Sequence, residues 1–273
     1  MCILWQKIYA TKTQRHKDAK MNINPPEADF VSWCPCGNLF RFIRVRYSGS
    51  MEKYSWSDPT GRTAFPVAKA GYPFIFSAAF VTLILALLGM TYLTLMGLFI
   101  TFFLCAFFRD PDRVIANDSG AIVSPADGKV ILVKNFDDSV FYEGSCTKIS
   151  IFMSLFNVHV NRIPIAGTVK KVRYYPGKFF AANQDKASLQ NEHNAVFLET
   201  ADGKSICVVQ VAGLIARRII CKVQPGEDML RGQRYGLICF GSRLDVYLPE
   251  DAEIKVTVGD RIKAGSALLG QFR

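Results

Sequence analysis

Three side chains of complementary chemistry stand far apart in this sequence: Asp127 in SPADGKV, His159 in FMSLFNVHVNRIP and Ser242 in RYGLICFGSRLDVYLP. A carboxylate can orient a histidine, and a neutral histidine can take the proton of a serine hydroxyl. Ser242 follows Gly241, and because glycine is small its carbonyl is open to attack by the neighbouring hydroxyl. The combination predicts a protein that cleaves its own backbone between Gly241 and Ser242.

Each of these residues also has an ordinary structural interpretation. A serine after a glycine is common in turns that join strands, and a histidine in an apolar strand is more often structural than catalytic. Asp127 occupies a Pro-Ala-Asp-Gly turn, where aspartate is favoured for its local hydrogen bonds alone. His193, in LQNEHNAV, competes with His159 as a site residue, whereas His16 lies in a region of different composition. The residue types alone therefore leave catalysis and structure both open.

The elements that must position these side chains are short. After residue 109 the sequence consists of apolar runs separated by Gly, Pro, Asp and Asn, which is typical of strands in a mostly antiparallel fold. Residues 222–238 and 255–272 repeat a strand–turn–strand pattern similar to the biotinyl/lipoyl-type barrel-sandwich fold. We therefore expect a mainly β, barrel-sandwich-like catalytic domain over residues 109–273.

Residues 70–108 carry no charge, and this run is much longer than the ~20 residues that one membrane-spanning helix needs. Gly89–Thr94 suits a turn, so we expect a hydrophobic membrane helix hairpin. A buried pair of core helices is the alternative, which the lack of an amphipathic period disfavours. Basic residues outside both ends predict a cell-membrane protein with its catalytic domain on the cytoplasmic side: Arg62, Lys69, Arg109 and Arg113.

The N-terminal region differs from the rest of the chain. Residues 1–50 show no sustained period, and we expect them to be a disordered extension, with the native start at Met51 and a juxtamembrane segment over 51–69. The eight cysteines are scattered, which favours reduced thiols over a disulfide framework. Cys34-Pro35-Cys36 lacks a second pair, so we expect no metal site.

The net charge of +10 has no accompanying nucleic-acid-binding motif, so we expect no nucleic acid as a partner. Beside a bilayer, basic residues more simply attract anionic lipid. A homo-oligomeric state stays open.

Five blocks together carry a family resemblance: FFRDPDR, SPADGKV, FNVHVNRIP, YYPGKFFAANQDKASLQNEHNAV and FGSRLDVYLP. From about Phe65 to Arg273 the chain resembles the short, membrane-associated form of the phosphatidylserine decarboxylase proenzymes. The resemblance implies that the Ser242 hydroxyl attacks the Gly241 carbonyl and that β-elimination of the resulting ester leaves a covalent pyruvoyl group at residue 242. A β chain would end at Gly241, and an α chain would begin at residue 242.

The resemblance also implies roles in phospholipid biosynthesis. His159 would act as the base during self-cleavage and later deliver a proton, and Asp127 would hold its tautomer. The pyruvoyl ketone would form a Schiff base with phosphatidylserine in the membrane and accept electrons as CO2 leaves, giving phosphatidylethanolamine. A weaker expectation places four further residues at the substrate: Lys178, Phe179, Phe180 and His193.

Three other classes of protein fit part of the pattern. A non-catalytic, membrane-anchored barrel-sandwich module would need only the fold, although neither repeated segment places a carrier lysine at its tip. A serine hydrolase would use the same three side chains on an outside substrate, but no G-x-S-x-G surrounds Ser242. A self-processing decarboxylase of a soluble amino acid would cleave similarly without needing the apolar run.

Overall fold

The computed structural model describes residues 66–116, 118, 120–180, 182, 190–213, 218–239 and 241–272. They belong to one compact unit, Met51–Arg273, and a second unit comprises Met1–Ser50. The expectations for the extension 1–50, for a start at Met51, for most of the juxtamembrane segment and for Cys34–Cys36 lie outside the described residues.

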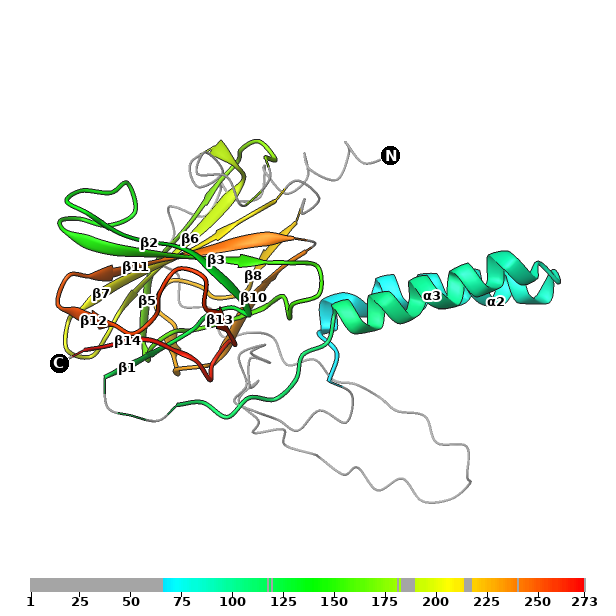
Figure 1. Ribbon diagram of the computed structural model, residues 1–273, viewed down its shortest axis with the longest axis horizontal. Helices are drawn as coiled ribbons and strands as arrows, with labels where there is room; N and C mark the ends of the chain where they lie inside the picture. The colour runs from blue at the N-terminus through cyan, green and yellow to red at the C-terminus, as the bar shows by residue number, and fades with distance from the viewer. Residues whose placement is uncertain are drawn as a thin grey trace, which may run out of the picture. The chain divides into compact units, whose positions relative to one another are not determined.

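Two apolar helices extend from the β domain side by side (Figure 1). A short 3-10 helix, η1 (Lys69–Gly71), leads into α2 (Tyr72–Leu87), and α3 (Thr91–Phe107) follows. The turn between them has Gly89 at φ 71°, in the left-handed region that favours glycine. Where the helices meet, Gly97 lies against Thr82, so a larger residue at 97 would press on the threonine hydroxyl.

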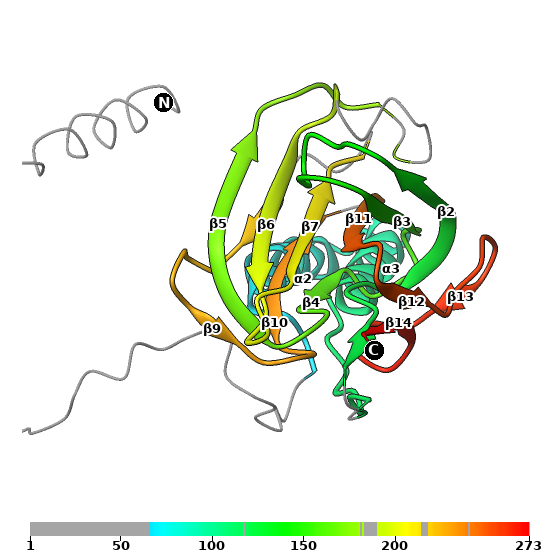
Figure 2. The same ribbon diagram turned by 90° about the vertical axis from the view of Figure 1, so that its left-hand side faces the viewer.

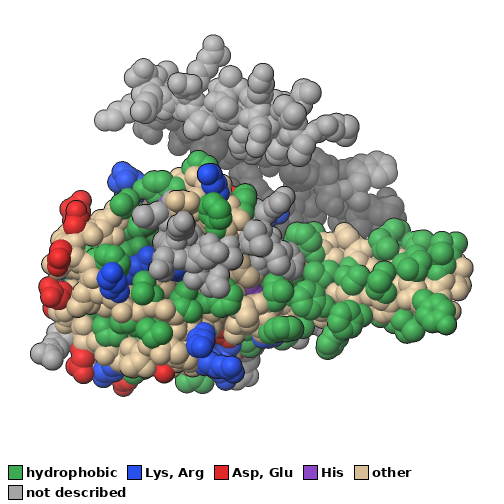
Figure 3. All heavy atoms as spheres, turned by 45° about the horizontal axis from the view of Figure 1, so that its top comes forward, with side chains coloured by type: hydrophobic (Ala, Val, Ile, Leu, Met, Phe, Trp, Pro, Cys, Tyr) green, Lys and Arg blue, Asp and Glu red, His purple; other side chains and the backbone are tan. Residues whose placement is uncertain are grey.

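Hydrophobic side chains cover the visible surface of both helices, whereas lysines and arginines are found over the β domain (Figure 3). Phe76, Leu87 and Tyr92 are 69%, 75% and 89% exposed. A helix that is apolar on all sides and exposed has no polar face to turn toward water. Lys69–Leu87 is long and apolar enough to cross a membrane, and Thr91–Phe107 is apolar but shorter.

An antiparallel sheet of eight strands forms the body of the domain and curls into an open half-barrel (Figure 2). The strands follow in the spatial order β13 (Arg261–Ile262), β2 (Gly128–Phe136), β3 (Cys146–Met153), β11 (Ser242–Pro249), β7 (Ser205–Val211), β6 (His193–Glu199), β5 (Gly167–Tyr175) and β9 (Asp228–Met229). The expectation of a mainly β domain is therefore confirmed.

Two three-stranded sheets complete the domain. One has the order β1 (Ala121–Val123), β14 (Leu268–Phe272) and β12 (Ala252–Ile254), and the other β4 (Val160–Arg162), β10 (Arg234–Ile238) and β8 (Ile219–Cys221). The repeated sequence pattern corresponds to the strand–turn–strand pairs β9–β10 and β13–β14. Likeness to a biotinyl/lipoyl-type barrel sandwich stays a prediction.

Strand β11 lies near the middle of the large sheet, and its side chains alternate between the two faces. Leu244, Val246 and Leu248 are buried in the main core. On the other face, the buried Arg243 guanidinium contacts Asp245 at 2.6 Å and the Ser150 hydroxyl at 2.8 Å. This alternation places Ser242, the first residue of the strand, on the core face.

Candidate active site

The Gly241–Ser242 bond lies where a turn enters β11. Gly241 has φ 67°, a conformation that favours glycine, and Ser242 is fully buried. The Ser242 hydroxyl lies 4.0 Å from the Met153 sulfur, opposite it on β3. Gly213 packs so closely against the Gly241 carbonyl oxygen that a Cβ at position 213 would collide with it. The Ser242 side of this bond is therefore enclosed, whereas Gly241 is half-buried.

His159, just before β4, is also fully buried and contacts the backbone of Gly241. Its Nδ1 lies 2.9 Å from the Asn157 carbonyl oxygen, and the Gly241 N–H points to its Nε2 at 3.4 Å. Because a carbonyl oxygen can only accept, these partners assign the proton to Nδ1 and a lone pair to Nε2. The lone pair of His159 Nε2 therefore faces the backbone N–H of Gly241, the residue before Ser242.

The surroundings of His159 favour its neutral form. The ring of Phe107, at the end of α3, lies 4.3 Å from the imidazole centroid. Burial, opposed in part by the Asn157 carbonyl and assisted by the positive charge of Arg109, lowers the pKa of His159 from 6.5 to about 4. A neutral imidazole at physiological pH is the form that can accept a proton.

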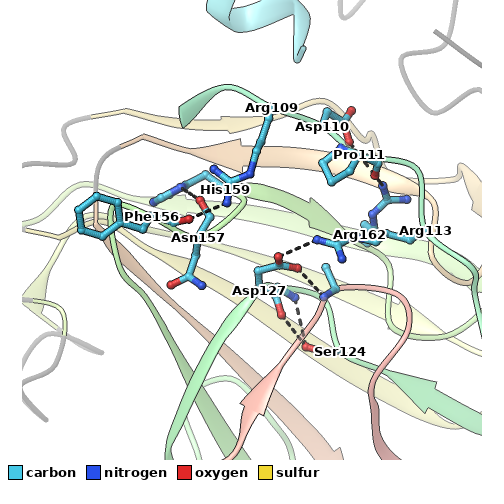
Figure 4. A network of polar contacts seen from close by, with 12 residues as sticks. Arg109, Asp110, Pro111, Arg113, Ser124, Asp127, Phe156, Asn157, His159 and Arg162 are labelled. Carbon is cyan, nitrogen blue, oxygen red and sulfur yellow. Dashed lines mark hydrogen bonds and ion pairs between the residues drawn. The ribbon is translucent and has the colours of Figure 1, made fainter. Parts of the chain in front are cut away.

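Asp127 has other partners. Its Oδ1 accepts the Ala264 N–H at 2.7 Å, and its Oδ2 pairs with the Arg113 guanidinium at 2.8 Å. Among the described residues, no hydrogen bond joins Asp127 to His159, and Figure 4 shows the two side chains in separate groups of contacts. A direct Asp127–His159 hydrogen bond is absent from this arrangement, so a triad role for Asp127 stays a prediction.

A cavity of about 700 Å³ is lined by Asp127 but not by His159 itself. Asp127 lines it on one side, and the segment before His159, including Asn157 and Val158, lines it on another. Arg109 also contributes to the lining, so the cavity lies at the end of the β domain from which the helices emerge.

The weaker candidates are divided between two places. His193 on β6 lies opposite Val211 on β7, and Val211 lies opposite Arg243 on β11. The His193 side chain is therefore on the same face of the sheet as Arg243 and on the opposite face from Ser242. There its Nδ1 lies 2.6 Å from the Asn191 carbonyl oxygen, and its ring stacks on Tyr175. The structure does not bring the His193 side chain to Ser242.

The segment of Lys178, Phe179 and Phe180 comes closer. The buried side chain of Asn191 bonds the Phe180 backbone in both directions and also donates to the Ala212 carbonyl at 2.7 Å. Gly213, next in the chain, contacts Gly241. Lys178 is exposed, and Phe179 packs at the edge of the main core. The segment is thus linked through Asn191 and the Ala212–Gly213 backbone to Gly241, without a ligand contact to define its role.

Sequence reasoning missed several members of this site. Asn157 orients His159 through a backbone carbonyl, which leaves no signature in residue type. Phe107 was assigned only to the apolar run, although its place as the last residue of α3 lets it reach His159. A buried amide chain runs near Ser242 on the core face: Gln210 donates to Asn161 at 2.9 Å, and Asn194 donates to Gln210 at 3.2 Å.

Residue chemistry in the described region offers no group of three metal-ligating side chains. The polar groups near Gly241 and Ser242 are instead a hydroxyl, a backbone amide and an imidazole.

Comparison with known proteins links this geometry to a family. Residues 100–270 match the family model described as phosphatidylserine decarboxylase. A phosphatidylserine decarboxylase proenzyme of Desulfotalea psychrophila is 51% identical over 207 residues, covering 76% of this chain and 97% of the relative. Proenzymes of the same name from Geotalea uraniireducens and Ralstonia nicotianae are 51% and 48% identical, covering 75% and 76% of this chain and 96% and 95% of the relatives. Since the family match includes the last residues of α3, His159 and the Gly241–Ser242 bond, this chain belongs to the phosphatidylserine decarboxylase family.

Proposed function

We propose that this protein decarboxylates phosphatidylserine to phosphatidylethanolamine after cleaving itself between Gly241 and Ser242. The observation that carries the proposal is the placement of His159. Its unprotonated Nε2 lies 3.4 Å from the backbone nitrogen of Gly241, the residue before Ser242, while Nδ1 is held by the Asn157 carbonyl. The relatives named above are proenzymes, which agrees with a chain that matures by cleavage.

Self-cleavage would use only groups of this chain. His159 Nε2 accepts the hydroxyl proton as the Ser242 oxygen attacks the Gly241 carbonyl carbon. The C–N bond breaks, the nitrogen gains a proton, and an ester joins residues 241 and 242. Removal of the Ser242 α-proton then breaks the Cβ–O bond and frees the Gly241 carboxylate. Addition of water to the remaining enamine releases ammonia and leaves a pyruvoyl end. The burial of Ser242 suits this route, because bulk water would hydrolyse the ester early.

A pyruvoyl group at residue 242 would supply an electron-accepting carbonyl for loss of the substrate carboxylate as CO2. The surroundings of Ser242 fit such a group, since they exclude water and hold one neutral base. Around it, His159 would hold or deliver a proton, with Nδ1 fixed by Asn157. Phe107 and Met153 would keep the site apolar.

The two apolar helices suit a substrate that stays in a bilayer. We propose that they form a hairpin in the membrane and that the β domain lies at the cytoplasmic surface, with Arg109 and Arg113 among the lipid headgroups. A diacyl substrate would then reach the site without leaving the membrane.

Intact mass measurement of the purified chain and two variants tests this function. We expect the wild type to give a fragment that begins at residue 242 with a pyruvoyl end, and to convert phosphatidylserine in mixed micelles. Ser242→Ala should remain uncleaved and inactive. Ser266→Ala is the matched control, because Ser266 also follows a glycine of positive φ but is exposed. An uncleaved wild type that still decarboxylates, or cleavage of Ser242→Ala, would refute the proposal.

A further inference from the structure

The cavity beside Asp127 is strongly basic. Five cationic side chains and a single carboxylate line it: Arg109, Arg113, Lys129, Arg261, Lys263 and Asp127. The excess of positive charge in one concave site exceeds what Asp127 can balance. Electrostatics therefore favour an anionic occupant.

The cations divide into two groups by what they already contact. Arg113 pairs with Asp127 at 2.8 Å, and Arg109 donates to the Ala106 and Phe156 carbonyls, at 2.6 Å each. In the described part of the chain, no ion pair or side-chain hydrogen bond is found for Lys129, Arg261 or Lys263, and all three side chains are exposed. Arg261 and Lys129 are register partners on β13 and β2, so they share one face of the sheet. Together they offer donors on one wall of the cavity.

The position of the cavity indicates the source of the anion. Arg109 follows the last turn of α3, and Phe156, which also lines the cavity, is 79% exposed beside it. An apolar ring and a row of cations at the base of two apolar helices match the chemistry of a phospholipid, whose phosphate lies directly above its acyl chains.

We propose that this cavity binds the phosphodiester of a membrane phospholipid, with Lys129, Arg261 and Lys263 as its cations. The phosphodiester would belong either to the decarboxylated lipid itself or to a second, anionic lipid. The assignment to the substrate rests on the proposed function, whereas binding of the phosphodiester does not.

Binding is tested on the full-length Ser242→Ala chain in detergent, by equilibrium dialysis with radiolabelled sn-glycero-3-phosphoserine. Each of Lys129→Gln and Arg261→Gln should weaken binding about fivefold, and the double variant about 25-fold. Lys171→Gln is the matched control, because it removes an exposed lysine from β5, far across the sheet from β13. The cavity is not a phosphodiester site if the parent Ser242→Ala chain, the two single variants and the double variant bind the probe equally, or if none of them binds it.

The source is distinguished with the cleaved enzyme in phosphatidylcholine vesicles that contain phosphatidylserine, with and without phosphatidylglycerol. If the substrate fills the cavity, phosphatidylglycerol inhibits the wild type, and the double variant has a raised KM with little change in kcat. If a second lipid fills it, phosphatidylglycerol activates the wild type, and the double variant loses this activation. Equal behaviour of the double variant and Lys171→Gln would overturn both assignments. A wild type that makes no phosphatidylethanolamine contradicts the proposed function instead, and leaves the dialysis result standing.

Discussion

Replacing Phe107 by alanine should change the protonation of His159. The Phe107 ring, itself 1% exposed, covers the imidazole at 4.3 Å, and burial is the main cause of the low pKa. Without the ring, water would reach His159, and its pKa should rise from about 4 toward 6.5. The proposed self-cleavage needs the neutral imidazole, so the variant should lose cleavage activity at a higher pH than the wild type.

The size of the effect on self-cleavage follows from the two limiting pKa values of His159, about 4 in the buried site and 6.5 in water. At pH 5 a histidine of pKa about 4 is about 90% neutral, whereas one of pKa 6.5 is about 3% neutral. The rate of self-cleavage at pH 5 should therefore fall by up to about 30-fold in Phe107→Ala, with a much smaller loss at pH 8.

Two measurements check this reasoning. NMR titration of the His159 ring in the uncleaved Ser242→Ala background reports the pKa directly, and gel analysis of freshly synthesised chains reports the rate of cleavage. Phe103→Ala is the control, because Phe103 lies one turn earlier on α3 and its ring contacts that of Phe107 in a tilted arrangement, with the centroids 6.3 Å apart. A titration midpoint for His159 that is the same in Phe107→Ala and the parent chain would refute the role of Phe107.

Four other outcomes are expected. The native pKa of His159 lies below its unfolded value, so the free energy of unfolding that this shift contributes is fully present above pH 6.5 and is lost as pH falls toward 4. Chemical denaturation of Ser242→Ala should show the free energy of unfolding falling by roughly 3 kcal/mol over that range. Gly213→Ala should slow self-cleavage about 100-fold, since its Cβ would displace the Gly241 carbonyl, whereas Gly203→Ala, in an open turn, should cleave normally. Asp127→Asn and Arg113→Gln should each slow cleavage about tenfold if Asp127 acts through its ion pair, and a slow Asp127→Asn beside a normal Arg113→Gln would point to direct action on His159. Arg243→Met should lower the free energy of unfolding by about 3 kcal/mol in the uncleaved chain, because it removes a buried partner of Asp245 while Lys148 remains at 3.1 Å.

Local patterns in the sequence were enough to predict the mainly β domain and the two apolar helices. Strand residues such as those of β11 and β3 form short apolar runs, and the helices are apolar on every side. The break between the helices was expected over Gly89–Thr94, and the structure turns at Gly89 and resumes the helix at Thr91.

The contact of His159 with Gly241 could be expected only from the family motifs, since 82 residues separate them. The partners of Asp127 depend on how β2 and the β13–β14 connection come together, which residue types do not encode. The side of the sheet on which His193 lies depends on strand register, where a shift of one residue reverses every side chain. Register is a property of pairs of strands, so no reading along one strand reveals it.

The place of Ser242 in the topology has a further consequence for the proposed cleavage. Residues 242–272 supply β11, between β3 and β7, and also β12, β13 and β14, which pair into two sheets. A cut before Ser242 would leave β11 bonded to β3 and β7 on its two sides, β13 bonded to β2 and β14 bonded to β1, so the two pieces should stay together without a covalent link. The same interleaving implies that the two pieces would not readily refold together after denaturation. The order of the strands in the sheets was established while both pieces belonged to one continuous chain. The mature enzyme would therefore be stabilised kinetically, by slow unfolding, and a molecule that unfolds after cleavage would not refold.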